Sequence, residues 1–304
     1  MNNLNQKITP TLWFDDKAEE AVNFYVSVFP NSKINFLKRW PQEGELPDEA
    51  IKPGTIKMAA FTLNGMQFYA FDAGPVFHFN PSISFYVVFE TVDEVNNAWE
   101  KLSEGGTTLM PLNRYDWSER YGWINDRYGV SWQIVKDELK NVGQPITPLL
   151  MFSGDKRGDA EEAMEFYISI FKDSALQGIA RYEEDDLGPH GMVKHGQCQL
   201  EGQTFMMMDN GTIKEIPFNE SISLYVNCRD QEEVDYYWDK FTKEGSVSQC
   251  GWLKDKYGVS WQIVPQFVME KVENGEAERV RNMENALYQM KKLDVVKLTE
   301  AYNK

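Results

Sequence analysis

Residues 123–135 read WINDRYGVSWQIV, residues 252–264 read WLKDKYGVSWQIV, and ten of the 13 positions are identical. Shorter matches precede this pair in the same order along the chain, namely 8–10 with 146–148, 24–25 with 166–167, 64–65 with 201–202 and 82–84 with 221–223. Matches that keep their order over this length indicate a duplicated structural unit. We therefore expect a first domain at 1–140, a second domain at 141–265 and a C-terminal helical appendix at 266–304.

The composition restricts the class of protein. The chain has 304 residues, 42% of them hydrophobic, and carries 31 Lys and Arg against 47 Asp and Glu, a net charge of −16. A chain this apolar can fold, and a chain this acidic repels nucleic acid and anionic membranes. No apolar run of about 18 residues and no signal peptide occurs, which favours a cytoplasmic location. The three cysteines form no C-x-x-C motif, so we expect reduced thiols.

Hydrophobic periodicity and turn signals give the same order of elements in both copies. In the first copy we expect a strand at 8–14, a helix capped by Asp15 or Asp16, a strand at 34–40 and a hairpin centred on Asn64-Gly65. A strand at 83–89, a helix that opens with the capping box Thr91–Glu94, and three further strands ending at 131–135 repeat this plan. Each domain is thus βαβββ twice, which places the chain in the α+β class.

Four strings carry a family resemblance: AEEAVNFYVSVF (18–29), FNPSISFYV (79–87), DRYGVSWQIV (126–135) and FNESISLYVN (218–227). With the paired modules, they resemble the vicinal oxygen chelate (glyoxalase/bleomycin resistance) superfamily, and within it the PhnB-like, demethylubiquinone methyltransferase-like branch. The resemblance implies tandem duplicated glyoxalase/bleomycin-resistance-type domains. In each, two βαβββ modules form a curled mixed-sheet cup with helices outside and a ligand inside.

The resemblance also implies where a metal would bind, because relatives use His and Glu on the first and last strands of each module. The corresponding positions here are Thr9, Tyr69, Ser84, Gln133, Thr147, Met206, Ser223 and Gln262. None of them is His, Asp or Glu, and neutral hydroxyls and amides are poor ligands for Zn²⁺, Fe²⁺ or Ni²⁺. We therefore expect no metal and no cofactor.

Strand alternation and hairpin register predict the side chains that line each cup. In the first cup the predicted ligand-binding residues are Thr9, Trp13, Met58, Tyr69, Phe71, Ser84, Tyr86 and Gln133. In the second they are Thr147, Gln197, Met206, Met208, Ser223 and Gln262.

His195 is the histidine that this register points into the second cup, beside Gln197 and Gln262. It is a candidate general base or ligand partner, and the alternative is an imidazole that only hydrogen-bonds the neighbouring glutamines. We expect His78 and His190 on the surface. The loop 115–121 is either a lid over the first cup or an ordinary solvated loop.

The function favoured by these patterns is metal-independent binding of a small organic ligand, aromatic or cationic, by a PhnB-like cytosolic protein. One alternative is a metal-free enzyme of lyase or isomerase type that uses His195. A metal-dependent glyoxalase or dioxygenase is a second, and the methyltransferase of the branch label is a third. A methyl donor needs a Gly-rich turn on a doubly wound sheet, and no G-x-G occurs. We expect the two domains to pair within one chain, with a homodimer as the alternative.

Overall fold

In the computed structural model the described residues are 6–42, 46 and 49–304. Their strands form two mixed eight-stranded sheets, A and B, which do not close into barrels. The chain separates into two compact units, Trp13–Ser221 and Met1–Leu12 with Ile222–Lys304. Each unit is described by itself below.

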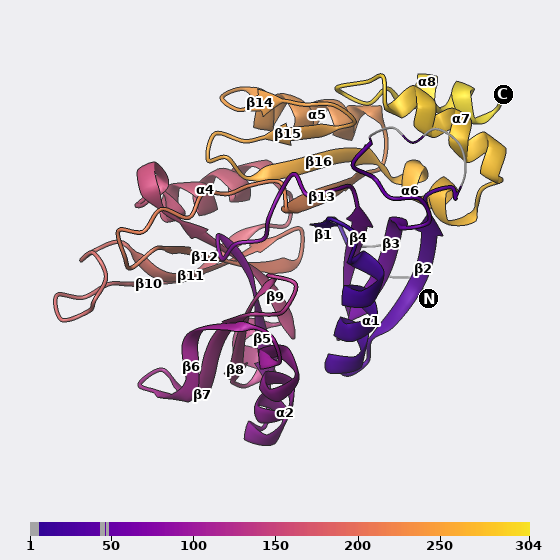
Figure 1. Ribbon diagram of the computed structural model, residues 1–304. Helices are drawn as coiled ribbons and strands as arrows, with labels where there is room; N and C mark the ends of the chain where they lie inside the picture. The colour runs from indigo at the N-terminus through magenta and orange to yellow at the C-terminus, as the bar shows by residue number, and fades with distance from the viewer. Residues whose placement is uncertain (1–5, 43–45, 47–48) are drawn as a thin grey trace. The chain divides into compact units, whose positions relative to one another are not determined.

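Sheet B lies wholly within the unit Trp13–Ser221 and can be followed strand by strand in Figure 1. Its order is β10 (Ala175–Arg181), β11 (Val193–Leu200), β12 (Gln203–Asp209), β9 (Ile146–Phe152), β5 (Ile83–Phe89), β8 (Ser131–Lys136), β7 (Ser118–Asn125) and β6 (Thr107–Tyr115). Parallel pairs (β12 with β9, β5 with β8) alternate with antiparallel ones, because each module closes with a long connection and a tight hairpin.

The remaining strands belong to sheet A. Within one compact unit they follow the order β14 (Ser246–Val247), β15 (Trp252–Lys254), β16 (Ser260–Pro265), β13 (Ile222–Cys228) and β1 (Ile8–Phe14). Within the other unit the order is β4 (Met66–Asp72), β3 (Ile56–Leu63) and β2 (Lys33–Arg39).

The helices lie between the strands along the chain or follow the last of them. They are α1 (Ala18–Val28), α2 (Val92–Ser103), α3 (Leu139–Val142), a 3₁₀ turn at Gly154–Lys156, α4 (Ala160–Ile170), α5 (Gln231–Thr242), α6 (Gln266–Asn274), α7 (Ala277–Leu287) and α8 (Val295–Tyr302). In sheet B, α2 packs on β7 and β8 and α4 packs on β11 and β12. The helices therefore leave the opposite face of sheet B for other side chains.

Strand pairing joins the two copies of the repeat. β5 of the first copy pairs antiparallel with β9 of the second, with Tyr86 opposite Thr147, and β1 pairs antiparallel with β13, with Thr9 opposite Tyr225. The expectation that the copies pair within one chain is confirmed. Each sheet takes one half from each copy.

This pairing shows that the predicted grouping of residues into one cup per copy is wrong. His195 lies on β11 of sheet B, whereas Gln262, its predicted neighbour, lies on β16 of sheet A. In the first copy, Thr9 and Tyr69 lie on strands of sheet A, whereas Ser84, Tyr86 and Gln133 lie on sheet B. Every strand edge offers the same backbone N–H and C=O groups, whatever its sequence. The side-chain pattern therefore does not reveal which module pairs with that edge.

Helix caps show a second difference. The Thr91–Glu94 capping box is confirmed at the start of α2. Asp15 and Asp16 do not cap α1, because the Oδ1 atom of Asp72, at the end of β4, accepts the Ala18 N–H at 2.8 Å. Asp209, at the end of β12, accepts the Ala160 N–H at 3.3 Å in the same way. A strand-end carboxylate therefore satisfies the first turn of the helix in each copy.

The D-x-Y-G-V-S-W-Q motif builds the core on the helix side of each sheet. Trp132 is fully buried, and its ring packs at a tilt against those of Tyr25 and Phe29, with centroid distances of 5.2 and 4.9 Å. Its Nε1–H donates to Asp126 Oδ2 at 2.8 Å. Tyr25 donates its hydroxyl to the same oxygen. Burial raises the pKa of Asp126, and these donors offset part of that effect. The expectation that Trp132 and Trp261 are core residues is confirmed, since Trp261 is also fully buried.

Candidate functional site

We call the face of sheet B opposite α2 and α4 the inner face. Gly196 faces the helices, because a Cβ atom at this position would lie 2.5 Å from the Met164 side chain of α4. Residues alternate between the two faces, and a cluster of apolar side chains covers the inner one. The inner-face residues are Ser84, Tyr86, Val88, Tyr121, Trp123, Ser131, Gln133, Val135, Thr147, Leu149, Met151, His195, Gln197, Met206 and Met208.

His195 lies on this inner face. The register that predicted this is observed, with Gln197 opposite Met206 and Cys198 opposite Phe205 on the helix side. The His195 ring centroid lies 5.9 Å from that of Tyr86. Burial lowers the pKa of His195, so the imidazole is kept neutral.

The alternative in which glutamines merely satisfy His195 does not hold. Gln197 donates instead to Gln177 Oε1 at 3.0 Å and to the Asn141 carbonyl oxygen at 3.3 Å, and Gln262 lies on the other sheet. The imidazole of His195 makes no hydrogen bond with any described residue. The expected surface positions of His78 and His190 are observed.

Two hydroxyl groups near the centre of the inner face are also unpaired. Tyr86 is half-buried, its hydroxyl has no hydrogen-bond partner within the described part of the chain, and burial raises its pKa. Thr147, directly opposite Tyr86, is fully buried, and its Oγ1 atom has no partner among the described residues. Of the two, Thr147 is the buried one, and a buried hydroxyl without a partner costs free energy until water or a ligand group binds it.

The other polar groups form fixed pairs. Gln133 donates its Nε2–H to Ser84 Oγ at 3.0 Å and accepts the Tyr121 hydroxyl on Oε1 at 2.8 Å. The Trp123 Nε1–H donates to Ser131 Oγ at 2.8 Å. These contacts set the orientation of the Gln133 amide and of the Trp123 ring.

Aromatic side chains on the β6–β7 hairpin extend the inner face to the surface. Tyr115 stacks on Trp117 at 4.9 Å and meets Tyr121 edge-on at 5.6 Å. Trp117 sits in the turn and is 57% exposed. The segment predicted as a loop is therefore the tip and two arms of a hairpin.

Sequence reasoning missed Tyr121 and Trp123 as inner-face residues. Their signal was present, since Trp123 lies opposite Gln133 and Tyr121 opposite Val135 in the antiparallel register. That register follows from the turn at Asp126–Gly129, which lies within the shared motif.

The predicted site residues on sheet A fall in both units. In one unit, Ser223 accepts the Gln262 Nε2–H at 2.9 Å, as Ser84 does from Gln133, and the Thr9 Oγ1 atom has no partner among the described residues. In the other unit, Trp13 lies 5.2 Å from Phe71, and Met58 and Tyr69 lie on neighbouring strands.

The donor set of the inner face does not fit the metal that the fold family implies. The four family positions on sheet B are held by Ser84, Gln133, Thr147 and Met206. Ser84 and Gln133 hydrogen-bond each other. Thr147 offers a neutral hydroxyl, and Met206 offers a thioether. Hard and borderline divalent metals prefer imidazole, carboxylate or thiolate ligands. No group of three His, Cys, Asp or Glu side chains that could hold a metal occurs among the described residues.

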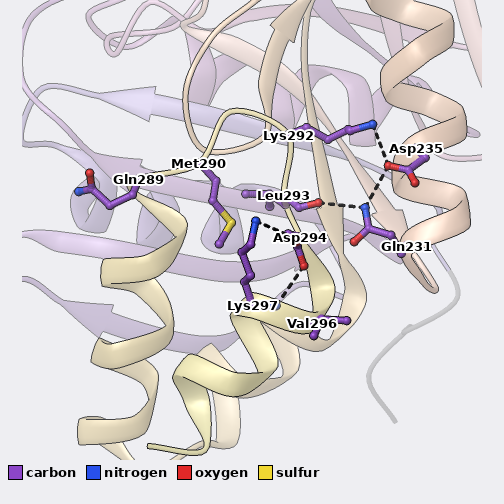
Figure 2. A pocket seen from close by; sticks show the side chains of 9 residues that line it. All are labelled: Gln231, Asp235, Gln289, Met290, Lys292, Leu293, Asp294, Val296 and Lys297. Atoms are coloured by element: carbon purple, nitrogen blue, oxygen red, sulfur yellow. Dashed lines mark hydrogen bonds and ion pairs between the residues drawn. The ribbon is translucent and has the colours of Figure 1, made fainter.

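A concave region lies beside the C-terminal helices, as Figure 2 shows. It is an open cavity of about 680 Å³ lined mainly by the start of α5 and by residues 289–297. Its polar groups pair with each other: Lys292 with Asp235 at 2.9 Å, and Gln231 with the Leu293 carbonyl oxygen at 3.1 Å. These contacts hold the C-terminal segment on α5 and leave few groups for a ligand.

Comparison with known proteins places the chain in a family. Residues 6–135 and again 144–264 match the sequence model of the family described as 3-demethylubiquinone-9 3-methyltransferase. The chain belongs to this family. It is similar to a PhnB protein of Bacillus cereus that carries the same methyltransferase name, with 45% identity, 43% of this chain and 98% of that chain covered, and a TM-score of 0.40.

Glyoxalase I from Zea mays is similar in fold, with 13% identity, 89% of this chain and 97% of that chain covered, and a TM-score of 0.56. This family member thus has a tandem fold similar to that of glyoxalase I. No curated protein matches the chain. No helix among the described residues is long and apolar enough to cross a membrane.

Proposed function

We propose that this PhnB-like protein binds a small organic ligand on the inner face of sheet B without a metal ion. The observation that carries the proposal is that the side chains of His195, Tyr86 and Thr147, on one face of one sheet, have no hydrogen-bond partner among the described residues. Aromatic rings and methionines surround them. A mostly apolar surface with a few placed polar groups is typical of a small-molecule site.

The family name and the fold suggest other chemistries, and the residues support them less. A glyoxalase or dioxygenase of this fold needs metal ligands, and Ser84, Gln133, Thr147 and Met206 do not supply them. A methyltransferase that uses a nucleoside methyl donor needs a Gly-rich turn on a parallel sheet. Both sheets here are mixed, and the sequence has no G-x-G. The free cysteines and the acidic charge favour a cytoplasmic location.

The test uses Nile red, an uncharged dye whose fluorescence rises in an apolar site. We expect the full chain to bind the dye with an affinity that neither a chelator nor added Zn²⁺ or Ni²⁺ changes. Met208→Trp fills the inner face of sheet B and should abolish binding. Phe71→Trp, at the corresponding position of the first copy, is the matched control and should retain it. Binding that requires the added metal, or that Met208→Trp leaves intact, would contradict the proposal.

A further inference from the structure

The charge of the inner face restricts the ligand. None of the inner-face residues is Asp, Glu, Lys or Arg, and its histidine is kept neutral by burial. A charged ligand would lose hydration on this face, and the side chains of the face itself offer no counter-charge; the charge that acts on Tyr86 is that of Asp137, which would repel an anion. Aromatic rings also attract organic cations, so a cationic probe is the sharpest comparison for this restriction. This surface therefore selects uncharged molecules.

The unpaired hydrogen-bond donors and acceptors of the inner face restrict the class of ligand further. Tyr86 and Thr147 each have a hydroxyl hydrogen with no acceptor within the described residues. Ser84 accepts from Gln133 but donates to no described residue. Fewer acceptors than donors lack a partner. They are one ring nitrogen of His195 and the side-chain Oδ1 atom of Asn125, at the end of β7. A ligand oxygen that accepts from Tyr86, and that can also donate if it is a hydroxyl, satisfies this set.

The shape of the lining indicates a flat ring. Tyr115, Tyr121 and Trp123 project from one hairpin, and Tyr86 reaches the same apolar cluster from β5. Met208 and Met110 are partly exposed beside them. Aromatic rings stack on or pack edge-on against planar ligands, and methionines adapt to ring edges.

From these three restrictions we infer that the ligand is an uncharged, planar aromatic molecule bearing a hydroxyl or carbonyl oxygen, which Tyr86 and His195 bind directly. The inference rests on the proposed function and deepens it, since it names the class of ligand for the same site. It assigns Tyr86 and His195 as the specificity-determining residues: they select the oxygen, and the hairpin aromatics select the ring.

The experiment compares probes of one ring size and different charge by isothermal titration at pH 7.5. The probes are naphthalene, 2-naphthol, 2-naphthoate and 2-naphthyltrimethylammonium. We expect 2-naphthol to bind at one site per chain, at least tenfold more tightly than either charged probe and more tightly than naphthalene. Tyr86→Phe should weaken 2-naphthol about 3- to 10-fold and leave naphthalene unchanged, because one neutral hydrogen bond is lost. Tyr225→Phe, at the corresponding position of the second copy, is the matched control and should change neither affinity.

The possible results distinguish an error in the ligand class from an error in the position of the site. If a charged probe binds as tightly as 2-naphthol and Met208→Trp blocks both, the ligand class is wrong and the proposed function stands. If Met208→Trp does not affect any probe, the site itself is wrong. If 2-naphthol fails to bind while Nile red binds and is blocked by Met208→Trp, the ligand class is again overturned. His195→Leu provides a second variant, with the same expected loss for 2-naphthol as Tyr86→Phe.

Discussion

The module that ends in β8 and the module that ends in β16 share a motif but differ in the hairpin before it. In the first, β6 and β7 are long and carry Tyr115 and Tyr121 onto the inner face of sheet B. In the second, β14 and β15 are two and three residues long, and Cys250 takes the place of Tyr121. There the N–H groups of Cys250 and Gly251 donate to the Met290 and Lys291 carbonyl oxygens of the C-terminal segment.

The two copies also differ in the residues at corresponding positions of β3 and β11 and of β4 and β12. Met58 corresponds to His195, and Tyr69 and Phe71 correspond to Met206 and Met208. One half of the duplication therefore keeps a neutral imidazole and adaptable methionines, and the other replaces them with a thioether and bulkier rings. The shared motif maintains two similar cores, while residues outside it make the two inner faces chemically different.

The largest effect should come from the shared motif. Trp132→Ala and Trp261→Ala should each lower the free energy of unfolding by about 3–5 kcal/mol, because each removes a fully buried indole. Urea denaturation at pH 7.5 measures this. If Trp132→Ala left stability intact and abolished ligand binding, the motif would belong to the site rather than to the core.

Next in size is the C-terminal segment that packs beside the short hairpin. Leu293 is fully buried, and its Cδ1 atom lies 3.2 Å from the Cβ position of a side chain placed at Gly251. Leu293→Ala should cost about 2–4 kcal/mol of unfolding free energy. The control Val296→Ala, at a side chain 63% exposed, should cost less than about 0.5 kcal/mol. Equal losses in the two variants would show that the segment is not a packed part of the fold.

A smaller effect distinguishes two tyrosines of the long hairpin, Tyr121 on β7 and Tyr115 on β6. Tyr121→Phe removes the donor to Gln133 Oε1 and leaves that buried oxygen unpaired, so we expect a loss of about 1 kcal/mol. Tyr115→Phe removes an exposed hydrogen bond to the Pro111 carbonyl oxygen and should change stability very little. Thermal unfolding of the two variants side by side measures the difference. If Tyr115→Phe proved the more damaging, the buried contact of Tyr121 with Gln133 would not be what stabilises this hairpin.

The smallest effect is a pH dependence at His195. Burial lowers its pKa in the folded chain, so the unfolded chain binds a proton first as the pH falls below about 6.5. Its contribution to stability is therefore complete above that pH and declines as the pH falls toward the pKa of the folded state. His195→Gln should flatten the loss of unfolding free energy between pH 7.5 and 5.5. His190→Gln, at an exposed histidine, should keep the wild-type slope; identical slopes in all three proteins would remove the basis for a buried neutral His195.

Much of the candidate site was predictable from local sequence. The Glu201-Gly202 hairpin sets the pairing of β11 with β12, and alternation from that turn places His195, Gln197 and Met206 on one face. The same reasoning places Ser84, Tyr86 and Gln133 together, since β5 and β8 belong to one module. Hydrogen bonds were less predictable, because whether Gln197 reaches His195 or Gln177 depends on side-chain positions from β10 and α3.

The sequence by itself determined the duplication, the order of elements in each module, the face on which each strand residue lies and the burial of Trp132 and Trp261. These follow from short-range rules: a period of two along a strand, a tight turn between neighbours, and an apolar stripe along a helix. Only the tertiary structure decided that β5 pairs with β9 and β1 with β13, and so which residues share a sheet. Such pairing depends on backbone groups that are alike in all strands and on packing between residues far apart in the chain. His195 thereby lies next to Tyr86 of the other copy rather than beside Gln262 of its own.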